Sequence, residues 1–96
     1  MQPGEEREDI QEMAAACEAL LFVSAEPVPL GDLRRVLAIR QPTLERVLDY
    51  LGKTLAEGQR CVRLQRHNDI VRLVTTPEAA HYIDKLKRQQ ATHPTP

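Results

Sequence analysis

The stretch "LLFVSAEPVPLGDL", residues 20–33, joins the end of one apolar helical pattern to the start of another. Pro27 and Pro29 each lack a backbone N–H, and each pushes the residue before it towards extended geometry. A helix entering this stretch must therefore stop near Ser24, and a new helix can begin at Leu30. The sequence predicts a corner that turns one helix against the next.

The same corner carries Ser24 and Glu26, which could be imagined as a nucleophile and its base. A nucleophilic serine needs a positioned base and usually a glycine-rich turn, and neither accompanies this pair. The histidines have no ligand-like spacing with the cysteines, and no glycine loop could hold a phosphate. We expect a protein that is not an enzyme, with no catalytic or metal site, no cofactor and no small-molecule substrate.

The helix before the corner is predicted to begin at Asp9, which forms a capping box with Glu12 three residues later. Its apolar side follows helical spacing through Ile10, Met13, Cys17, Leu20 and Leu21. Residues 1–8 are acidic and polar, the opposite of a secretory signal peptide. They are expected to be a flexible N-terminus.

Two further helices follow the corner. The first takes its apolar side from Leu30, Leu33, Val36 and Leu37 and ends around Ile39. Pro42 suits the first position of the next helix, where no amide hydrogen bond is needed, and Gly58 is predicted to end it in a left-handed conformation. The predicted buried stripe of this helix is Leu44, Val47, Leu48, Leu51 and Leu55.

After Gly58 the apolar spacing changes from helical to alternating. The alternation continues on both sides of His67-Asn68-Asp69, a segment that can turn. It predicts an antiparallel hairpin whose inner face is Val62, Leu64, Val71 and Leu73.

A last helix is predicted after Thr76, which serves as its cap, with Pro77 and Glu78 in its first turn. Its inner face is expected to be Ala79, Ile83 and Leu86, with Tyr82 as a further candidate. From Gln89 the sequence has no pattern, so residues 89–96 are expected to be a disordered tail. Three helices, a two-stranded hairpin and a C-terminal helix form a winged helix, a mainly helical α+β fold, over residues 9–88.

Composition limits the chain to one small domain. Its 96 residues have a net charge of −1, but residues 1–57 hold 11 acids and 6 bases, while residues 58–96 hold 3 acids and 7 bases. This asymmetry indicates either a polar binding face in the second half or a solvated surface. No apolar run approaches the roughly 20 residues of a membrane span. Cys17 and Cys61 are isolated and are predicted to be reduced thiols packed as small apolar groups.

Two kinds of surface site are predicted. Apolar residues outside the inward sets could form a dimer contact, and these are Tyr50, Ile70 and Val74, together with Val28 between the prolines. The alternative is that Val74 and Tyr50 pack under the last helix. Bases on the hairpin could instead grip a DNA backbone, and these are Arg60, Arg63, Arg66 and Arg72.

A DNA-binding transcriptional regulator is the alternative function, because winged helices often read DNA with their third helix. Here the outward positions of that helix repel phosphate, since three acids outnumber two bases. These positions are Glu45, Arg46, Asp49, Lys53 and Glu57. Any contact with DNA is therefore expected to be weak and to come from the hairpin.

Two blocks of the sequence carry a family resemblance. Residues 18–39, "EALLFVSAEPVPLGDLRRVLAI", and residues 64–86, "LQRHNDIVRLVTTPEAAHYIDKL", resemble the segregation and condensation protein B (ScpB) family. The chain departs from the family at Ala25, where glycine is usual, and at Pro29, where a capping serine is usual. Asp69-Ile70 replaces a Gly-Gly turn at the tip of the hairpin.

The resemblance implies a non-catalytic subunit of the bacterial SMC–kleisin condensin complex, acting in chromosome condensation and segregation. In that family two winged helices follow one another, and this chain corresponds to the first. The implied partners are a second copy of the chain, the kleisin ScpA and, through it, the SMC ATPase. The implied location is the cytoplasm, in association with the nucleoid.

Overall fold

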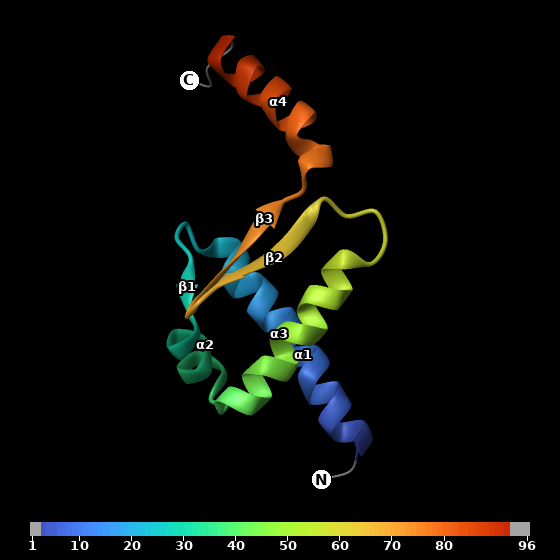
Figure 1. Ribbon diagram of the computed structural model, residues 1–96, viewed down its shortest axis with the longest axis vertical. Helices are drawn as coiled ribbons and strands as arrows, with labels where there is room; N and C mark the ends of the chain where they lie inside the picture. Colours follow the sequence, from blue (N-terminus) through green and yellow to red (C-terminus); the bar gives the residue numbers. More distant parts are fainter. Residues whose placement is uncertain (1–2, 93–96) are drawn as a thin grey trace.

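The computed structural model describes residues 3–92 of the chain, which form four helices and a small antiparallel sheet (Figure 1). In chain order the elements are α1 (Pro3–Val23), β1 (Val28–Pro29), α2 (Leu30–Leu37), α3 (Gln41–Ala56), β2 (Val62–His67), β3 (Ile70–Thr75), the 3₁₀ turn η1 (Pro77–Ala79) and α4 (Ala80–Thr92). The predicted mainly helical α+β winged helix is confirmed, with one strand more than expected.

The corner at residues 20–33 is confirmed. Helix α1 ends at Val23, and the Ser24 hydroxyl donates a hydrogen bond to the carbonyl of Leu20 (2.7 Å). Pro29 has extended geometry, and α2 begins at the next residue. Ser24 is thus a helix-end residue whose hydroxyl is already engaged, so the reading as a reactive loop is wrong.

The unexpected strand β1 lies inside this corner. Val28 pairs with Val71 and Pro29 with Ile70, so β3 is the central strand in the order β1-β3-β2. The N–H of Leu30 donates to the carbonyl of Asp69 (2.8 Å), which fixes the corner to the hairpin tip. Val28 is half-buried by this pairing and is not the exposed residue that the sequence suggested.

Helix α1 begins at Pro3, so the prediction that Asp9 caps it was wrong. Gly4 is the only poor helix former between Pro3 and Asp9, proline suits the first turn of a helix, and a sequence rich in acids is favoured at the positive end of the helix dipole. Of the expected flexible segment 1–8, residues 3–8 are helical, and residues 1 and 2 lie outside the described residues.

Helix α2 ends in a left-handed residue, whereas the left-handed residue after α3 comes one position beyond its extended cap, Glu57. Ala38 (φ 57°) ends α2 two residues earlier than expected; Gly58 has the predicted left-handed conformation (φ 74°), but α3 already ends at Ala56. All five residues of the predicted α3 stripe are buried. Val36, in contrast, is 65% exposed, so its place in the inner side of α2 was wrong.

The hairpin has the predicted faces. Leu64 pairs with Leu73 and Arg66 with Val71, so these side chains share the face towards the helices. Val71 is buried and Leu64 and Leu73 pack against the core, which confirms the inward set. At the tip, Asn68 takes the positive φ (56°), a conformation that asparagine tolerates, while Ile70 remains in the strand.

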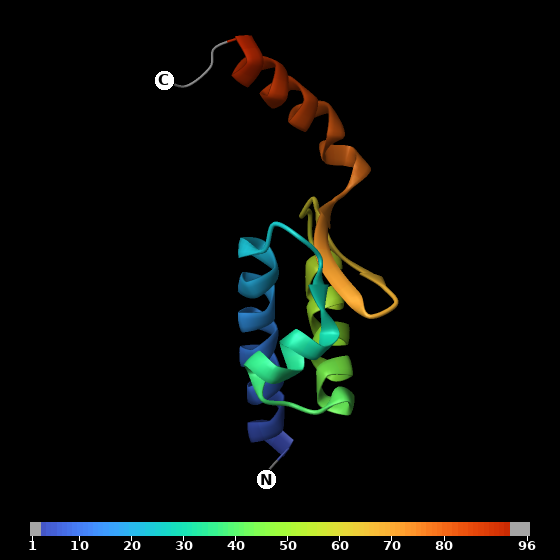
Figure 2. The ribbon, with the colours of Figure 1, turned by 90° about the vertical axis from the view of Figure 1, so that its left-hand side faces the viewer.

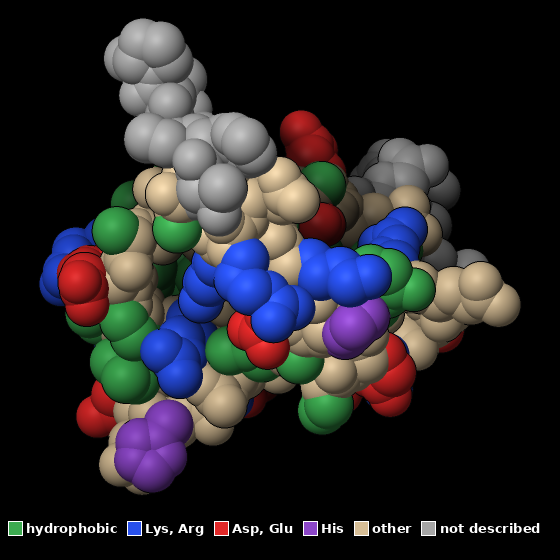
Figure 3. Space-filling view, turned by 90° about the horizontal axis from the view of Figure 1, so that it is seen from above, with side chains coloured by type: hydrophobic (Ala, Val, Ile, Leu, Met, Phe, Trp, Pro, Cys, Tyr) green, Lys and Arg blue, Asp and Glu red, His purple; other side chains and the backbone are tan. Residues whose placement is uncertain are grey.

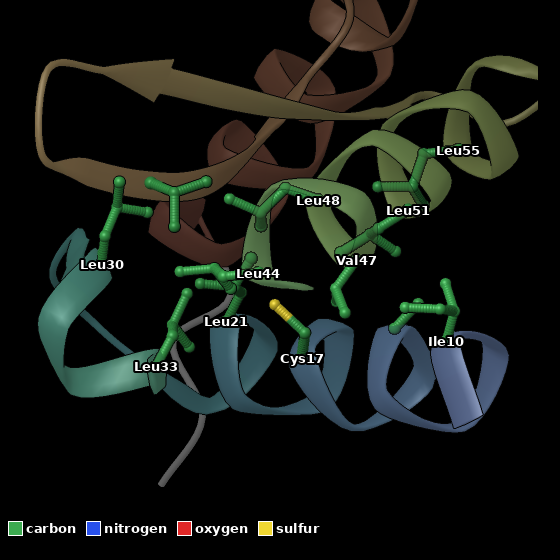
Figure 4. Close-up of a cluster of buried hydrophobic side chains, with 12 residues drawn as sticks. Ile10, Cys17, Leu21, Leu30, Leu33, Leu44, Val47, Leu48, Leu51 and Leu55 are labelled. Carbon is green, nitrogen blue, oxygen red and sulfur yellow. The ribbon is translucent and has the colours of Figure 1, made fainter. Parts of the chain in front are cut away.

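The core lies between α1 and α3, closed by α2 and by β3 (Figure 4). Its buried members are Ile10, Ala14, Cys17, Leu21, Leu30, Leu33, Leu44, Val47, Leu48, Leu51, Leu55 and Val71. Cys17 is fully buried at the centre, as predicted, and burial raises the pKa of its thiol to about 11. Cys61 is exposed, so its predicted packing was wrong.

Helix α4 projects away from the body formed by the other elements (Figures 1 and 2). The described molecule measures 55 × 27 × 26 Å, and α4 accounts for its elongation. Of the predicted inner face, Ala79 and Ile83 are half-buried, whereas Leu86 is 58% exposed and the further candidate Tyr82 is 71% exposed. The helix continues to Thr92, beyond the expected end at Arg88, and residues 93–96 of the predicted tail lie outside the described residues. Thr76 precedes η1 without a side-chain capping bond.

Candidate interaction surfaces

The hairpin arginines are largely engaged within the chain. The Arg63 guanidinium donates to the carbonyls of Leu55 (3.1 Å), Arg60 (2.7 Å) and Val62 (2.9 Å), which fastens the start of β2 to the end of α3. Arg72 donates through Nε to the side-chain oxygen of Gln65 (2.8 Å). These contacts hold the Arg63 and Arg72 side chains in place, so the two side chains are less available to bind a DNA phosphate.

Arg66 lies on the opposite face of the hairpin from Arg63 and Arg72. Its two terminal nitrogens donate to the two carboxylate oxygens of Glu45 on α3 (2.6 and 2.7 Å). The hydrogen bond from Arg66 is the main cause that lowers the pKa of the Glu45 carboxyl, and the same bond raises the pKa of Arg66. The structure therefore does not bring the four predicted arginines into one DNA-facing patch.

A basic turn between α2 and α3 was not predicted. Arg34, Arg35 and Arg40 line a notch of about 410 Å³ together with Gly31, Ile39 and Gln41. Arg35 is paired with Asp32, whereas the guanidinium groups of Arg34 and Arg40 make no ion pair with any described residue. The basic turn could have been predicted from the three arginines that lie close together in the sequence on either side of Ala38. The left-handed conformation of Ala38 turns the chain from α2 towards α3.

Basic side chains also gather at the end of the molecule from which α4 projects. Seen along the long axis, Lys and Arg side chains cover the middle of this face, with few acids among them (Figure 3). The excess of basic over acidic residues in the second half of the sequence therefore corresponds to a basic face of the folded molecule.

The predicted dimer residues do not form a single patch. Ile70 and Val74 share the outer face of the hairpin with Arg72 between them. Gly52 faces the hairpin, with Leu64 close to its backbone, and Tyr50 lies about 200° around α3 from Gly52. Because α4 projects away, the alternative that Val74 and Tyr50 pack beneath it was wrong.

Ile70 also lines an open groove of about 460 Å³ beside the corner. Pro27 lines it from the corner, and His67 and Arg72 contribute polar groups from the hairpin. The groove combines apolar and cationic groups and contains no pair of groups suited to acid–base chemistry.

Exposed apolar side chains occur at two further places, one that the sequence patterns did not mark and one that they had assigned to a buried face. Phe22 is 80% and Val23 75% exposed at the end of α1, and Tyr82 and Leu86 are exposed on α4. The first pair lies off the apolar stripe of α1, which is the only signal that the sequence offered for them.

Among residues 3–92, no group of three or more His, Cys, Asp or Glu side chains is placed to hold a metal ion. Within the same range, no helix is long and apolar enough to cross a membrane. The surface features of these residues are exposed apolar groups and arginines.

The fold and these surfaces define the class: a winged helix whose exposed features suit protein association. Residues 15–94 match the family described as segregation and condensation complex subunit ScpB, and the chain belongs to that family. This confirms the family resemblance.

Relatives in several bacteria agree with the family. The chain is 35% identical over 69 residues to segregation and condensation protein B of Clostridium botulinum strain Hall, covering 72% of this chain and 36% of that protein. It is 32% identical over 83 residues to the protein of the same description from Carboxydothermus hydrogenoformans, covering 86% of this chain and 45% of that protein. The chain thus spans less than half the length of these curated relatives.

Two solved structures share the fold. One is a crystal structure of a dimer of the ScpB N-terminal domain complexed with a ScpA peptide (TM-score 0.74, 27% identity, 80% of this chain and 96% of that chain). The other is a conserved hypothetical protein from Chlorobium tepidum (TM-score 0.71, 29% identity, 83% of this chain and 51% of that chain). The near-complete coverage of the first structure identifies the winged helix as equivalent to the ScpB N-terminal domain.

Proposed function

We propose that this chain is a dimerisation module of the SMC–kleisin condensin complex and acts in chromosome condensation and segregation. The observation that carries the proposal is the similarity to the ScpB N-terminal domain, whose structure was solved as a dimer with a ScpA peptide. The exposed apolar side chains at the ends of the molecule support it, because exposed apolar patches mark sites of association.

Self-association is tested by sedimentation equilibrium over a concentration series from micromolar to millimolar. The expected result is a monomer–dimer equilibrium. A chain that stays monomeric throughout would contradict the proposal. Tyr50, Ile70 and Val74 remain predicted contacts, and each is tested separately, since they lie on two different surfaces.

Binding of the kleisin ScpA, and through it the SMC ATPase, is the second part of the proposal. The groove beside Ile70 supports it, since its apolar and cationic lining suits an acidic segment with apolar anchors. A labelled ScpA peptide is titrated with the wild-type chain and with Ile70→Glu, and Val36→Glu serves as the control at another exposed apolar position. Equal affinity of all three would exclude the groove, and lack of binding by the wild type would exclude the contact.

Weak binding to a DNA backbone is a second candidate, and the basic turn favours it over the hairpin. Arg34 and Arg40 carry guanidinium groups without an ion-pair partner among the described residues. Gel shifts at increasing salt should show binding only at low salt. Arg34→Ala with Arg40→Ala should abolish that binding, while Arg63→Ala should leave it. Both the condensin role and such binding are consistent with a cytoplasmic location at the nucleoid.

A further inference from the structure

The projecting helix α4 has one apolar side. Tyr82, Ile83 and Leu86 lie within about 100° of one another around the helix axis, and Tyr82 and Leu86 are mostly exposed. Lys85 and Lys87 lie about 100° to either side of this strip. The apolar strip is therefore bordered by positive charge on both edges.

An isolated helix of this length is marginal in water, because its stability normally comes from packing of the apolar side. The joint before α4 holds the helix away from its own body: Thr76 is buried, its N–H donates to the carbonyl of Cys61 (3.0 Å), and Pro77 fixes the next φ angle. The apolar side of α4 is therefore available for packing against a partner outside this body.

The exposed side of α1 is complementary to α4. Ala15, Ala19 and Phe22 lie on one exposed strip, and small side chains there allow another helix to approach closely. Glu12 and Glu18 lie about 60° to either side of the strip. This strip has negative edges where the strip of α4 has positive ones.

The charges also decide against pairing of α4 with a second α4. Lys85, Lys87 and Arg88 outnumber Asp84 on that helix, so two copies of it would repel each other. Described residues 9–23 of α1, in contrast, carry Asp9, Glu12 and Glu18 and no base. The favourable partner for α4 is α1.

We propose that α4 of one copy packs its Tyr82–Leu86 strip on the Ala15–Phe22 strip of α1 in a second copy, and that the second copy returns the contact. A reciprocal contact of this kind is the isologous arrangement of a closed dimer. The inference rests on the proposed dimerisation and names the surfaces that carry it. It commits the association to helices, where the sequence had indicated the hairpin and α3.

Charge reversal tests the pairing. One variant combines Lys85→Glu with Lys87→Glu, and the other combines Glu12→Lys with Glu18→Lys. Each alone places like charges along both edges of the contact and should weaken dimerisation at least about tenfold in sedimentation equilibrium. Arg34→Glu with Arg40→Glu is the matched control for the lysine variant: it makes the same change in net charge outside both strips and should leave dimerisation unchanged.

Mixing the two separately purified variants gives the decisive result. In a heterodimer both contacts become complementary again, so dimers should reappear with near-wild-type affinity. Packing of α4 on its own α1 predicts no recovery on mixing, and pairing of α4 with α4 predicts that the α1 variant dimerises normally. Either outcome overturns the inference.

Apolar substitution gives an independent test. Tyr82→Ser with Leu86→Ser should abolish dimerisation, whereas Val36→Ser, at another exposed apolar position, should not. Thermal unfolding at a concentration below dimerisation should be the same for both, because neither site packs on the body. If the wild type dimerises and the α4 variant dimerises equally, the inference fails and the proposed function stands. A wild type that never dimerises overturns both.

Discussion

Helices α3 and α4 follow similar sequence patterns and have opposite fates in the structure. Each begins with a proline nearby and repeats apolar residues at helical spacing. The stripe of α3 is buried in five places, whereas the strip of α4 faces solvent. The difference shows that an amphipathic pattern predicts that a helix has a partner, and does not say whether the partner is in the same chain.

The two helices should differ most in local stability. At a concentration below dimerisation, amide hydrogens of α4 are expected to exchange roughly a thousandfold or more faster than the slowest amides of α3, since only α3 needs global unfolding to open. Hydrogen exchange followed by mass spectrometry or NMR measures this ratio. Raising the concentration should slow exchange in α4 and leave α3 unchanged. If the amides of α3 and α4 were equally protected from exchange in dilute solution, the expected difference in local stability would be contradicted.

A matched pair of truncations compares the helices side by side. Leu48→Ala, in the core, is expected to lower the free energy of unfolding by about 2–5 kcal/mol because it leaves a cavity. Leu86→Ala, on α4, should change it by less than about 0.5 kcal/mol in dilute solution, where the residue is 58% exposed. Urea unfolding of both variants checks the pair. A large loss at Leu86 would show that α4 packs on the body.

The two thiols extend the comparison to chemistry. Cys17 is buried, and its pKa in the folded chain, about 11, lies above the 9.0 of an ordinary thiol. The unfolded chain therefore releases this proton first, so stability that is complete below pH 9 should fall as pH rises from 9 to 11. A thiol reagent at neutral pH should modify Cys61 quickly and Cys17 only on unfolding. The variant Cys17→Ala should lose the alkaline decline that this thiol causes.

The smallest effect concerns the ion pair that ties β2 to α3. Because Arg66 lowers the pKa of Glu45, the pair stabilises the fold above the ordinary carboxyl pKa of 4.5, and this contribution is lost as pH falls through the lowered value. Glu45→Gln should therefore lower the melting temperature slightly at pH 7 and not at the acid end. The pair is half-exposed, so added salt should shrink the difference. Asp49→Asn, which removes the exposed pair with Lys53 away from the hairpin, is the control.

Most of the fold could be predicted because it depends on local rules. Prolines placed the corner, periodicity placed α3 and the hairpin, and Gly58 marked a left-handed end. Strand β1 could not be foreseen, because two residues that include a proline carry no strand pattern and pair only once the corner meets the hairpin. The start of α1 was misplaced because Asp9 is a good cap that the preceding residues made unnecessary.

The surfaces were harder to predict, since they depend on register and on the direction of α4. Alternation assigned the four apolar hairpin residues correctly, but it did not reveal that Arg66 shares their face and meets Glu45. The exposure of Tyr82 and Leu86 depends on the short joint at Thr76 and Pro77, which no periodicity encodes.

Strand β1 also affects how the protein behaves when crowded with copies of itself. An open sheet edge can recruit a strand from another molecule and grow into an aggregate. Here that edge is two residues long, and Pro29 has no N–H to offer an incoming strand. Pro27 and Pro29 thus protect the chain against uncontrolled β-assembly at this edge. Association through the helices can then form a closed oligomer with a fixed number of copies.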